Sequence, residues 1–326
     1  MTSFQGIYTA LITPFKNGKV DERAFGDFVE WQIAEGVHGL VPCGTTGESP
    51  TLSHAEHNRV IDLCVEVARG RVPVMAGTGS NSTDEAIMTT RHAKKAGAAA
   101  ALVVAPYYNK PTQEGLYQHF KAIADAVKIP IIIYNVPGRT IVNISDDTLA
   151  RLAELPNMVG LKDATGDLAR PYMLRAKLNI SSPWKGEDQD GGRSPRAKSL
   201  KPTPTPTLPL PGGGSFVMLS GEDQTAVAFN IAGGQGCISV SSNIMPKACA
   251  EVQNACLAGD YAKAVKLHEK LVPLHEIMFC ETSPAPVKFA ASLMGKCSPE
   301  LRLPMIQPNA DNKKHIKQVL KNLRLL

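Results

Sequence analysis

The stretch Met158-Val159-Gly160-Leu161-Lys162-Asp163-Ala164 is an apolar run that is too short to form a typical helix. A central strand that is buried on both faces of a parallel sheet has this near-continuous apolar pattern. We therefore expect Lys162 to lie on a buried strand, where loss of hydration disfavours the ammonium form and leaves free amine to attack a carbonyl. Taken alone, Lys162 is better explained as a strand-end lysine that reaches solvent, so its interpretation depends on the rest of the chain.

The preceding strand candidate, Ile129–Val136, ends next to two groups that complement an amine. It contributes the phenol of Tyr134, and the guanidinium of Arg139 follows shortly after it. The carboxyl ends of neighbouring parallel strands lie at the same edge of a sheet. An amine, a proton-transferring phenol and an anion-binding guanidinium at that edge indicate Schiff-base chemistry on a keto acid.

The rest of the chain alternates short apolar runs with longer amphipathic ones. The predicted strands are Gly6–Thr13, Gly39–Cys43, Val72–Gly77, Ala100–Ala105, Ile129–Val136, Val159–Asp163, Phe216–Ser220 and Gly236–Val240. The predicted helices between them are Glu22–Glu35, Ala55–Arg69, Asp84–Ala96, Glu114–Ala126, Asp147–Glu154, Leu168–Leu178 and Thr225–Ala232. This alternation favours an α/β fold in which a parallel sheet closes into a (β/α)8 TIM barrel. The alternative, an open doubly wound sheet, usually carries a G-x-G-x-x-G turn after its first strand, and residues 13–18 do not match that turn.

The alternation stops after Asn243. Four further helices are predicted without strands between them: Lys247–Ala258, Tyr261–Met278, Pro286–Met294 and Asn312–Leu326. We assign residues 1–258 to the barrel, which the first of these helices completes, and residues 259–326 to a C-terminal helical domain. Residues 181–215 are rich in Pro and Gly and offer little apolar surface to bury, so we expect a disordered insertion between the sixth helix and the seventh strand. A Pro-rich recognition peptide is the alternative for this segment.

The composition limits the class of protein. A chain of 326 residues with 43% hydrophobic residues can bury a large core. The net charge of +5 is modest and no nucleic-acid-binding motif accompanies it. The N-terminus lacks a signal-peptide pattern, the longest apolar stretch is too short to span a bilayer, and the seven cysteines form no C-x-x-C pair. We expect a cytoplasmic enzyme with reduced thiols that binds neither nucleic acid nor membrane.

Unusual polar residues follow the predicted strands, which is where barrel enzymes place their active sites. They are Gly44-Thr45-Thr46-Gly47-Glu48-Ser49, Gly77-Thr78-Gly79-Ser80-Asn81, Pro106-Tyr107-Tyr108-Asn109-Lys110-Pro111, Tyr134, Arg139, Lys162 and Gly221-Glu222-Asp223. Each of them alone is typical of a turn or of packing. Together they predict an active site at the carboxyl ends of the strands.

Four motifs resemble the dihydrodipicolinate synthase branch of the N-acetylneuraminate lyase family of class I aldolase barrels. They are Gly44-Thr45-Thr46-Gly47-Glu48-Ser49, Pro106-Tyr107-Tyr108, Tyr134-Asn135-Val136-Pro137-Gly138-Arg139-Thr140 and Gly160-Leu161-Lys162-Asp163-Ala164-Thr165-Gly166. The resemblance covers nearly the whole chain apart from the insertion. It implies a lyase that condenses pyruvate with L-aspartate 4-semialdehyde through a lysine Schiff base. The product is 4-hydroxy-tetrahydrodipicolinate, and the reaction is the committed step of diaminopimelate and lysine biosynthesis.

The resemblance also implies a role for each matching residue. The catalytic residues are Lys162, which forms the imine, and the proton relay of Tyr134, Thr46 and Tyr108. Tyr108 is implied to reach in from a neighbouring subunit of a homotetramer built as a dimer of dimers. Thr45 and Thr46 are implied to hold the pyruvate carboxylate and Arg139 the semialdehyde carboxylate, while Gly221 and Ile238 line the pocket. No metal or organic cofactor is implied, because the imine itself is the electron sink.

The pair His54 and His57 forms an H-x-x-H pattern with three interpretations. A zinc site lacks an evident third ligand. An exposed helix start needs no ligand at all. The resemblance implies the third, a feedback site for L-lysine made by Ser49, His54, His57, Asn81, Glu85 and Tyr107.

Two alternative functions stay open. One is another pyruvate-dependent lyase of the same family, acting on N-acetylneuraminate or a keto-sugar acid, and Arg139 argues against it. The other is a non-catalytic barrel that binds small molecules, and the complete polar set argues against that.

Overall fold

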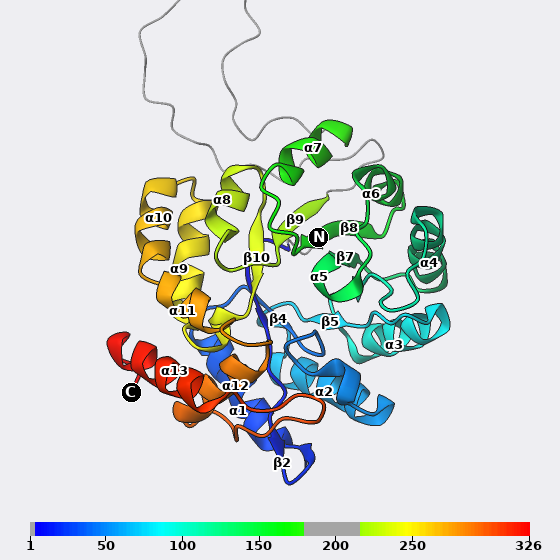
Figure 1. Ribbon diagram of the computed structural model, residues 1–326. Coiled ribbons are helices and arrows are strands. Elements are labelled where there is room, and N and C mark those ends of the chain that lie inside the picture. Colours follow the sequence, from blue (N-terminus) through cyan, green and yellow to red (C-terminus); the bar gives the residue numbers. More distant parts are fainter. Residues whose placement is uncertain (1–3, 179–215) are drawn as a thin grey trace, which may run out of the picture.

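Eight parallel strands form a barrel in a computed structural model that describes residues 4–178 and 216–326. Around the barrel the strand order is β4-β1-β10-β9-β8-β7-β6-β5. Their bounds are β1 Gly6–Ala10, β4 Gly39–Val41, β5 Met75–Gly77, β6 Ala100–Val104, β7 Ile131–Asn135, β8 Met158–Asp163, β9 Val217–Ser220 and β10 Gly236–Ser239. Helices surround the strands (Figure 1), so the predicted TIM barrel is confirmed.

The barrel closes at a seam between β4 and β5. Leu40 forms a parallel bridge with Val74, and its N–H donates to the Pro73 carbonyl oxygen at 3.1 Å. At the other end of the seam, the Gly77 N–H donates to the Pro42 carbonyl oxygen at 2.9 Å. A Cβ at Gly77 would lie 2.2 Å from the Cys43 carbonyl oxygen, so a side chain here would push the two strands apart.

The helices of the barrel lie between its strands, and α1, α2, α3, α4 and α6 each start at a residue whose side chain caps the helix. Ser53 and Glu56 form the capping box at the start of α2, and Ser82 and Ser145 accept from backbone N–H groups at the starts of α3 and α6. Gly97 ends α3 in the left-handed conformation. The bounds are α1 Glu22–Ala34, α2 His54–Ala68, α3 Thr83–Ala96, α4 Gln113–Ala126, α6 Asp146–Ala153, α7 Arg170–Lys177, α8 Ala226–Ile231 and α9 Pro246–Leu257.

Some short elements were not expected, and one expected helix is interrupted. A hairpin of β2 (Phe15–Lys16) and β3 (Lys19–Val20) follows the first strand, and the single-turn helix α5 (Pro137–Thr140) follows β7. The helix expected over Tyr261–Met278 is wrong as a single element. It divides into α10 (Tyr261–Glu269) and α11 (Val272–Ile277), with Pro273 in the first turn of α11, where its missing N–H costs no helical hydrogen bond.

The C-terminal helices pack against the barrel rather than apart from it. One cluster of buried residues contains Ile7 and Leu11 of the barrel together with Leu274, Val287 and Ile316 of the helices that follow it. These helices include α12 (Ala285–Leu293) and α13 (Ala310–Asn322). The assignment of residues 259–326 to a domain of their own stays a prediction. The predicted insertion 181–215 lies outside the described residues, between α7 and β9.

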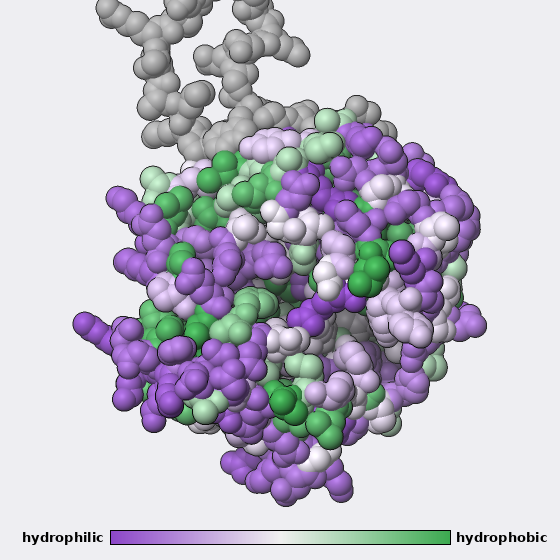
Figure 2. All heavy atoms as spheres, in the orientation of Figure 1, coloured by the Kyte–Doolittle hydropathy of each residue, from purple (hydrophilic) through white to green (hydrophobic). Residues whose placement is uncertain are grey.

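The interior of the barrel holds a separate apolar cluster that includes Tyr8, Val41, Leu102, Ile132 and Leu219. On the outside, hydrophilic residues cover most of the face shown in Figure 2, with small hydrophobic patches between them. No helix in the described part of the chain is long and apolar enough to cross a membrane.

Candidate active site

Lys162 and Tyr134 lie side by side at the mouth of the barrel. They are direct partners in the parallel pairing of β7 with β8, so their side chains leave the sheet on the same face. The Lys162 Nζ lies over the Tyr134 ring, 4.1 Å from its centroid, and each residue is only 7% exposed. The structure therefore places the candidate nucleophile against the candidate proton carrier inside the barrel.

A cavity in front of this pair is lined by most of the residues predicted to form the site. Of the residues predicted to be catalytic or substrate-binding, those that line the cavity are Thr45, Thr46, Tyr134, Arg139, Lys162 and Gly221. They come from loops or strand ends that are far apart in sequence. The cavity combines an amine, hydroxyl groups and a guanidinium, as binding and activating a keto acid requires.

A tight turn after β4 presents the two threonines. The Gly47 N–H donates to the Gly44 carbonyl oxygen and the Glu48 N–H to the Thr45 carbonyl oxygen, both at 3.1 Å. Thr13 Oγ1 donates to the Gly47 carbonyl oxygen at 2.7 Å, which ties the turn to the segment after β1. Hydroxyl and backbone N–H groups held in this way can donate hydrogen bonds to a carboxylate.

Arg139 reaches the same cavity from α5. Its Nη2 donates to the carbonyl oxygen of Ser283 at 3.3 Å, and the side chain is exposed to solvent at the barrel mouth. Ser283 also lines the cavity, as does Phe279. The segment before α12 thus forms part of the wall.

A buried polar network supports the strands behind Lys162. Because side chains alternate along a strand, Asp163 faces away from the cavity. It accepts from Asn135 Nδ2 at 3.1 Å and from Thr165 Oγ1 at 2.6 Å, and it lies 3.5 Å from the Arg170 guanidinium. Burial raises the pKa of Asp163, and Arg170 opposes that shift. The network fixes the ends of β7 and β8, which carry Tyr134 and Lys162.

Two acidic residues follow β9. Glu222 lines the cavity. Its pKa is raised, mainly by burial and to a smaller extent by the charge of Asp223, whereas the charges of Lys162 and Arg139 lower it. Asp223 is buried and accepts from the backbone N–H groups of Val240 at 2.8 Å and Ser241 at 3.0 Å. Asp223 therefore holds the chain that follows β10, whereas Glu222 faces the reacting groups.

Two predicted residues do not line this cavity. Ile238 is buried in the interior cluster of the barrel, and Val240 of the same segment lines the cavity instead. Tyr108 is 92% exposed and has a left-handed backbone with φ of 73°, which is uncommon outside glycine. In a single chain the Tyr108 hydroxyl is therefore not brought to Lys162.

A second, larger cavity of about 570 Å³ adjoins the first. Of the predicted lysine-site residues, its lining contains Ser49, His54, His57, Glu85 and Tyr107. Asn81, the sixth, donates from Nδ2 to the Tyr107 carbonyl oxygen at 3.2 Å. Thr45 and Arg139 line both cavities.

The second cavity carries a carboxylate and a neutral imidazole. His54 Nε2 lies 3.4 Å from Glu85 Oε1. Burial lowers the pKa of His57 to about 4, so that ring is uncharged at neutral pH. Among residues 4–178 and 216–326, no three His, Cys, Asp or Glu side chains are grouped so that they could hold a metal ion.

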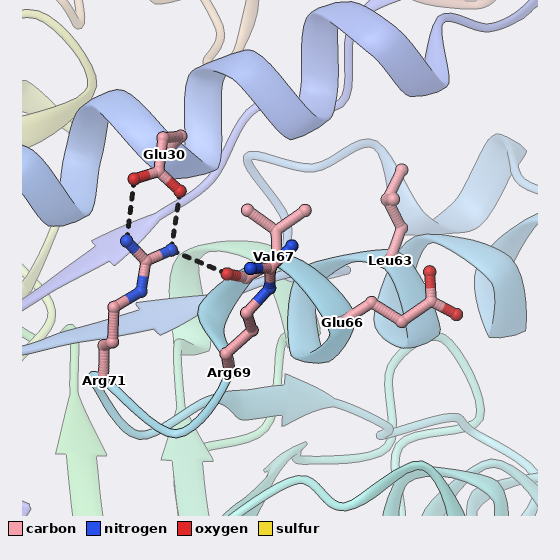
Figure 3. A pocket seen from close by; sticks show the side chains of 6 residues that line it. All are labelled: Glu30, Leu63, Glu66, Val67, Arg69 and Arg71. Carbon is pink, nitrogen blue, oxygen red and sulfur yellow. Dashed lines mark hydrogen bonds and ion pairs between the residues drawn. The ribbon is translucent and has the colours of Figure 1, made fainter.

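A third concavity lies on the outer surface between α1 and the end of α2 (Figure 3). Arg71 donates from Nη1 and Nη2 to the two carboxylate oxygens of Glu30 at 2.7 and 2.6 Å, and also to the Val67 carbonyl oxygen. These groups satisfy one another and join the two helices, so we assign this surface no functional role.

The model of the dihydrodipicolinate synthetase family matches residues 3–190 and 212–323 of this sequence. The chain belongs to this family. Residues 191–211, which the match leaves out, fall within the segment predicted to be an insertion.

Relatives in the family are similar along nearly the whole chain. A 4-hydroxy-tetrahydrodipicolinate synthase from Rhodospirillum centenum is 57% identical over 323 residues, covering 99% of both chains. The enzyme of that name from Afipia carboxidovorans is 53% identical over 325 residues, covering 100% of this chain and 98% of its own.

Solved structures of the family superpose closely. A chloride-inhibited dihydrodipicolinate synthase from Acinetobacter baumannii, complexed with pyruvate, has a TM-score of 0.87 and 43% identity, and the match covers 99% of this chain and 100% of that one. The synthase from Cyanidioschyzon merolae with lysine bound has a TM-score of 0.85 and 31% identity, covering 99% of each chain.

The structure adds site residues of this family member that were not assigned from the sequence. Glu222 belongs to the polar set noted after the seventh predicted strand, but it was given no role there. Phe279 and Ser283 carried no signal of that kind, because they precede a helix near the C-terminus and reach the cavity only through tertiary packing.

Proposed function

We propose that this chain condenses pyruvate with L-aspartate 4-semialdehyde to give 4-hydroxy-tetrahydrodipicolinate, a lyase reaction of diaminopimelate and lysine biosynthesis. The names of relatives that are 53–57% identical over essentially the full chain support this reaction. One structural observation carries the proposal: the buried Lys162 amine lies over the Tyr134 ring in a cavity that also contains Thr45, Thr46 and Arg139.

The chemistry starts with the Lys162 amine, which attacks the keto carbon of pyruvate. Loss of water gives an imine, and loss of a methyl proton turns the imine into an enamine. The enamine carbon forms a bond to the aldehyde carbon of the semialdehyde, whose oxygen is protonated to a hydroxyl. The amino group of the semialdehyde then attacks the imine carbon and expels the Lys162 amine, which closes the ring and frees the product. No metal or organic cofactor is required by these steps.

Proton transfer is assigned to Tyr134, Thr46 and Tyr108. A hydroxyl can donate and accept at once, as a relay requires. Tyr134 and Thr46 line the cavity, whereas Tyr108 is 92% exposed on its own chain. This exposure supports a Tyr108 supplied by a second copy across a two-fold interface, within a homotetramer built as a dimer of dimers.

Substrate carboxylates are assigned to two places. Thr45 and Thr46 hold that of pyruvate, and Arg139 holds that of the semialdehyde, because a guanidinium binds a carboxylate through two parallel N–H groups. Gly221 completes the wall, and Ile238 supports it from the buried layer behind the cavity.

L-Lysine is assigned to the second cavity as an effector. A lysine-bound relative supports this ligand. Glu85 offers a carboxylate to an amino group, next to Ser49, His54, His57, Asn81 and Tyr107. Because Thr45 and Arg139 line both cavities, a ligand here can affect groups that bind the substrates.

The decisive experiment is borohydride reduction in the presence of pyruvate, followed by peptide mapping. We expect a stable pyruvate-derived adduct on Lys162, and none after Lys162→Arg. Absence of that adduct on the wild-type protein would refute the proposal. A parallel screen of aldehyde partners distinguishes the semialdehyde from the sugar substrates of related lyases.

A further inference from the structure

A buried ion pair connects the turn after β4 to the C-terminal helix α12. Lys288 Nζ lies 2.6 Å from Glu48 Oε1, and the two residues are 0% and 3% exposed. They are separated by 240 residues in sequence. Neither has a place in the proposed chemistry.

The surroundings of the pair come largely from the C-terminal part of the chain. The other carboxylate oxygen of Glu48 accepts from the Arg302 N–H at 3.2 Å. The Lys288 Nζ also lies over the ring of Phe15, 3.9 Å from its centroid, and the Arg302 guanidinium lies 4.4 Å from the same centroid. Both oxygens of Glu48 are thus held from the C-terminal side.

Glu48 is part of the turn that carries the threonines. Its N–H donates to the Thr45 carbonyl oxygen at 3.1 Å, and its carbonyl oxygen accepts from the Thr51 N–H at 3.0 Å. Its φ of 55° is left-handed, a conformation that a non-glycine residue keeps only when its surroundings enforce it. The carboxylate contacts and these backbone hydrogen bonds together hold Glu48 in that conformation.

A buried ion pair is a poor way to gain stability alone. Removing two charges from water costs about as much as their attraction returns, and well-packed apolar residues often serve better. Burial lowers the pKa of Lys288, while the neighbouring Glu48 carboxylate favours its charged form. Such a pair is better explained by the geometry that it enforces.

We propose that Lys288 is a positioning residue, which through Glu48 holds the turn that presents Thr45 and Thr46 to the pyruvate carboxylate. This inference rests on the proposed function, because it takes from that function the binding of pyruvate by Thr45 and Thr46. Lys288 then affects substrate binding from α12, although it does not itself line the cavity.

Lys288→Met tests the inference. We expect the KM for pyruvate to rise about 10- to 100-fold, as misplacement of a binding group by around 1 Å produces, with a much smaller change in kcat and in the KM for the semialdehyde. Amide hydrogen exchange should accelerate in peptides covering residues 44–52. The matched control is Lys296→Met, since Lys296 also lies over an aromatic ring, that of Trp31, just after the same helix.

The double variant Glu48→Gln/Lys288→Met separates positioning from stability. It leaves no unpaired buried charge, so its Tm should be closer to the wild-type Tm than the Tm of Lys288→Met is. We expect its KM for pyruvate to stay raised. A double variant with wild-type KM and wild-type exchange at 44–52, or an equal effect of Lys296→Met, would overturn the inference. Absence of a pyruvate adduct on wild-type Lys162 would instead defeat the proposed function, and the exchange measurement would still report on the turn.

Discussion

The guanidinium of Arg139 donates to the carbonyl oxygen of Ser283 at 3.3 Å, across 144 residues of sequence. This contact joins α5, which follows β7, to the segment that precedes α12. It holds a cation at the barrel mouth, where the second substrate must enter.

Arg139→Lys keeps the charge but loses the planar fork. We expect kcat/KM for L-aspartate 4-semialdehyde to fall about 100-fold, on the scale of a hydrogen bond to a charged group. Steady-state kinetics with each substrate varied in turn measure this. Borohydride trapping with pyruvate alone should match the wild type, and a variant that traps no pyruvate would contradict the assignment of Arg139 to the second substrate.

Tyr134→Phe removes one hydroxyl and leaves the ring beneath Lys162. Loss of a proton-transfer group should lower kcat by about 10²- to 10⁴-fold, while the ring preserves the packing of the amine. Stopped assays of turnover, with thermal unfolding as the check on folding, test this. The opposite finding, full turnover without the hydroxyl, would remove Tyr134 from the relay. Tyr117→Phe is the control, because that ring packs against Arg151 outside the site.

Glu85→Gln removes the carboxylate of the second cavity. We expect the Kd for L-lysine to rise about tenfold or more, since a charge-assisted hydrogen bond to the effector is lost. Isothermal titration calorimetry measures the affinity, and Glu114→Gln serves as a surface control. Wild-type protein that binds no lysine, with turnover unchanged at millimolar lysine, would remove the effector site altogether.

Glu56→Gln removes one half of a two-bond ion pair. Arg302 donates to the Glu56 carboxylate at 2.8 and 2.6 Å, which lowers the pKa of Glu56 from 4.5 to about 2. A carboxylate with a depressed folded-state pKa stabilises the fold above pH 4.5, and this stabilisation is lost as the pH falls toward 2. We expect a loss of about 1–2 kcal/mol at neutral pH, after allowance for solvent screening.

Urea unfolding of both proteins at several pH values checks this stability prediction. The difference between Glu56→Gln and wild type should shrink steadily below pH 4.5. Glu66→Gln on the same helix breaks an exposed pair with Arg59 and should change stability far less. A difference that is independent of pH would show that the pair does not carry the effect.

The sequence was sufficient to predict the barrel, because the strands are apolar runs and most of the helices between them start at a capping side chain. It also identified Thr45, Thr46, Tyr134, Arg139 and Lys162, which the structure brings to one cavity. In a parallel barrel the carboxyl ends of all strands lie on the same face, so the residues that follow the strands come together there.

What could not be predicted depends on packing between distant segments. Lys288 has the sequence context of an ordinary lysine on an amphipathic helix, and only the folded chain shows it buried against Glu48. The break between α10 and α11, by contrast, could have been predicted from Pro273, because proline has no N–H to donate inside a helix and favours the start of a new one. The single turn α5 is shorter than the window over which helical periodicity can be recognised.

The seam between β4 and β5 determines where the barrel wall can open transiently. Pro42 and Pro73 lie along it and have no N–H to donate, so fewer hydrogen bonds can cross there than between β7 and β8. We expect transient parting of the wall to begin at this joint, and labile amides beside it to exchange first. Thr45 follows β4 on one side of the seam, and Gly79 and Ser80 follow β5 on the other side. All three line the second cavity. A small molecule bound in that cavity would contact both sides of the seam and make its opening less frequent.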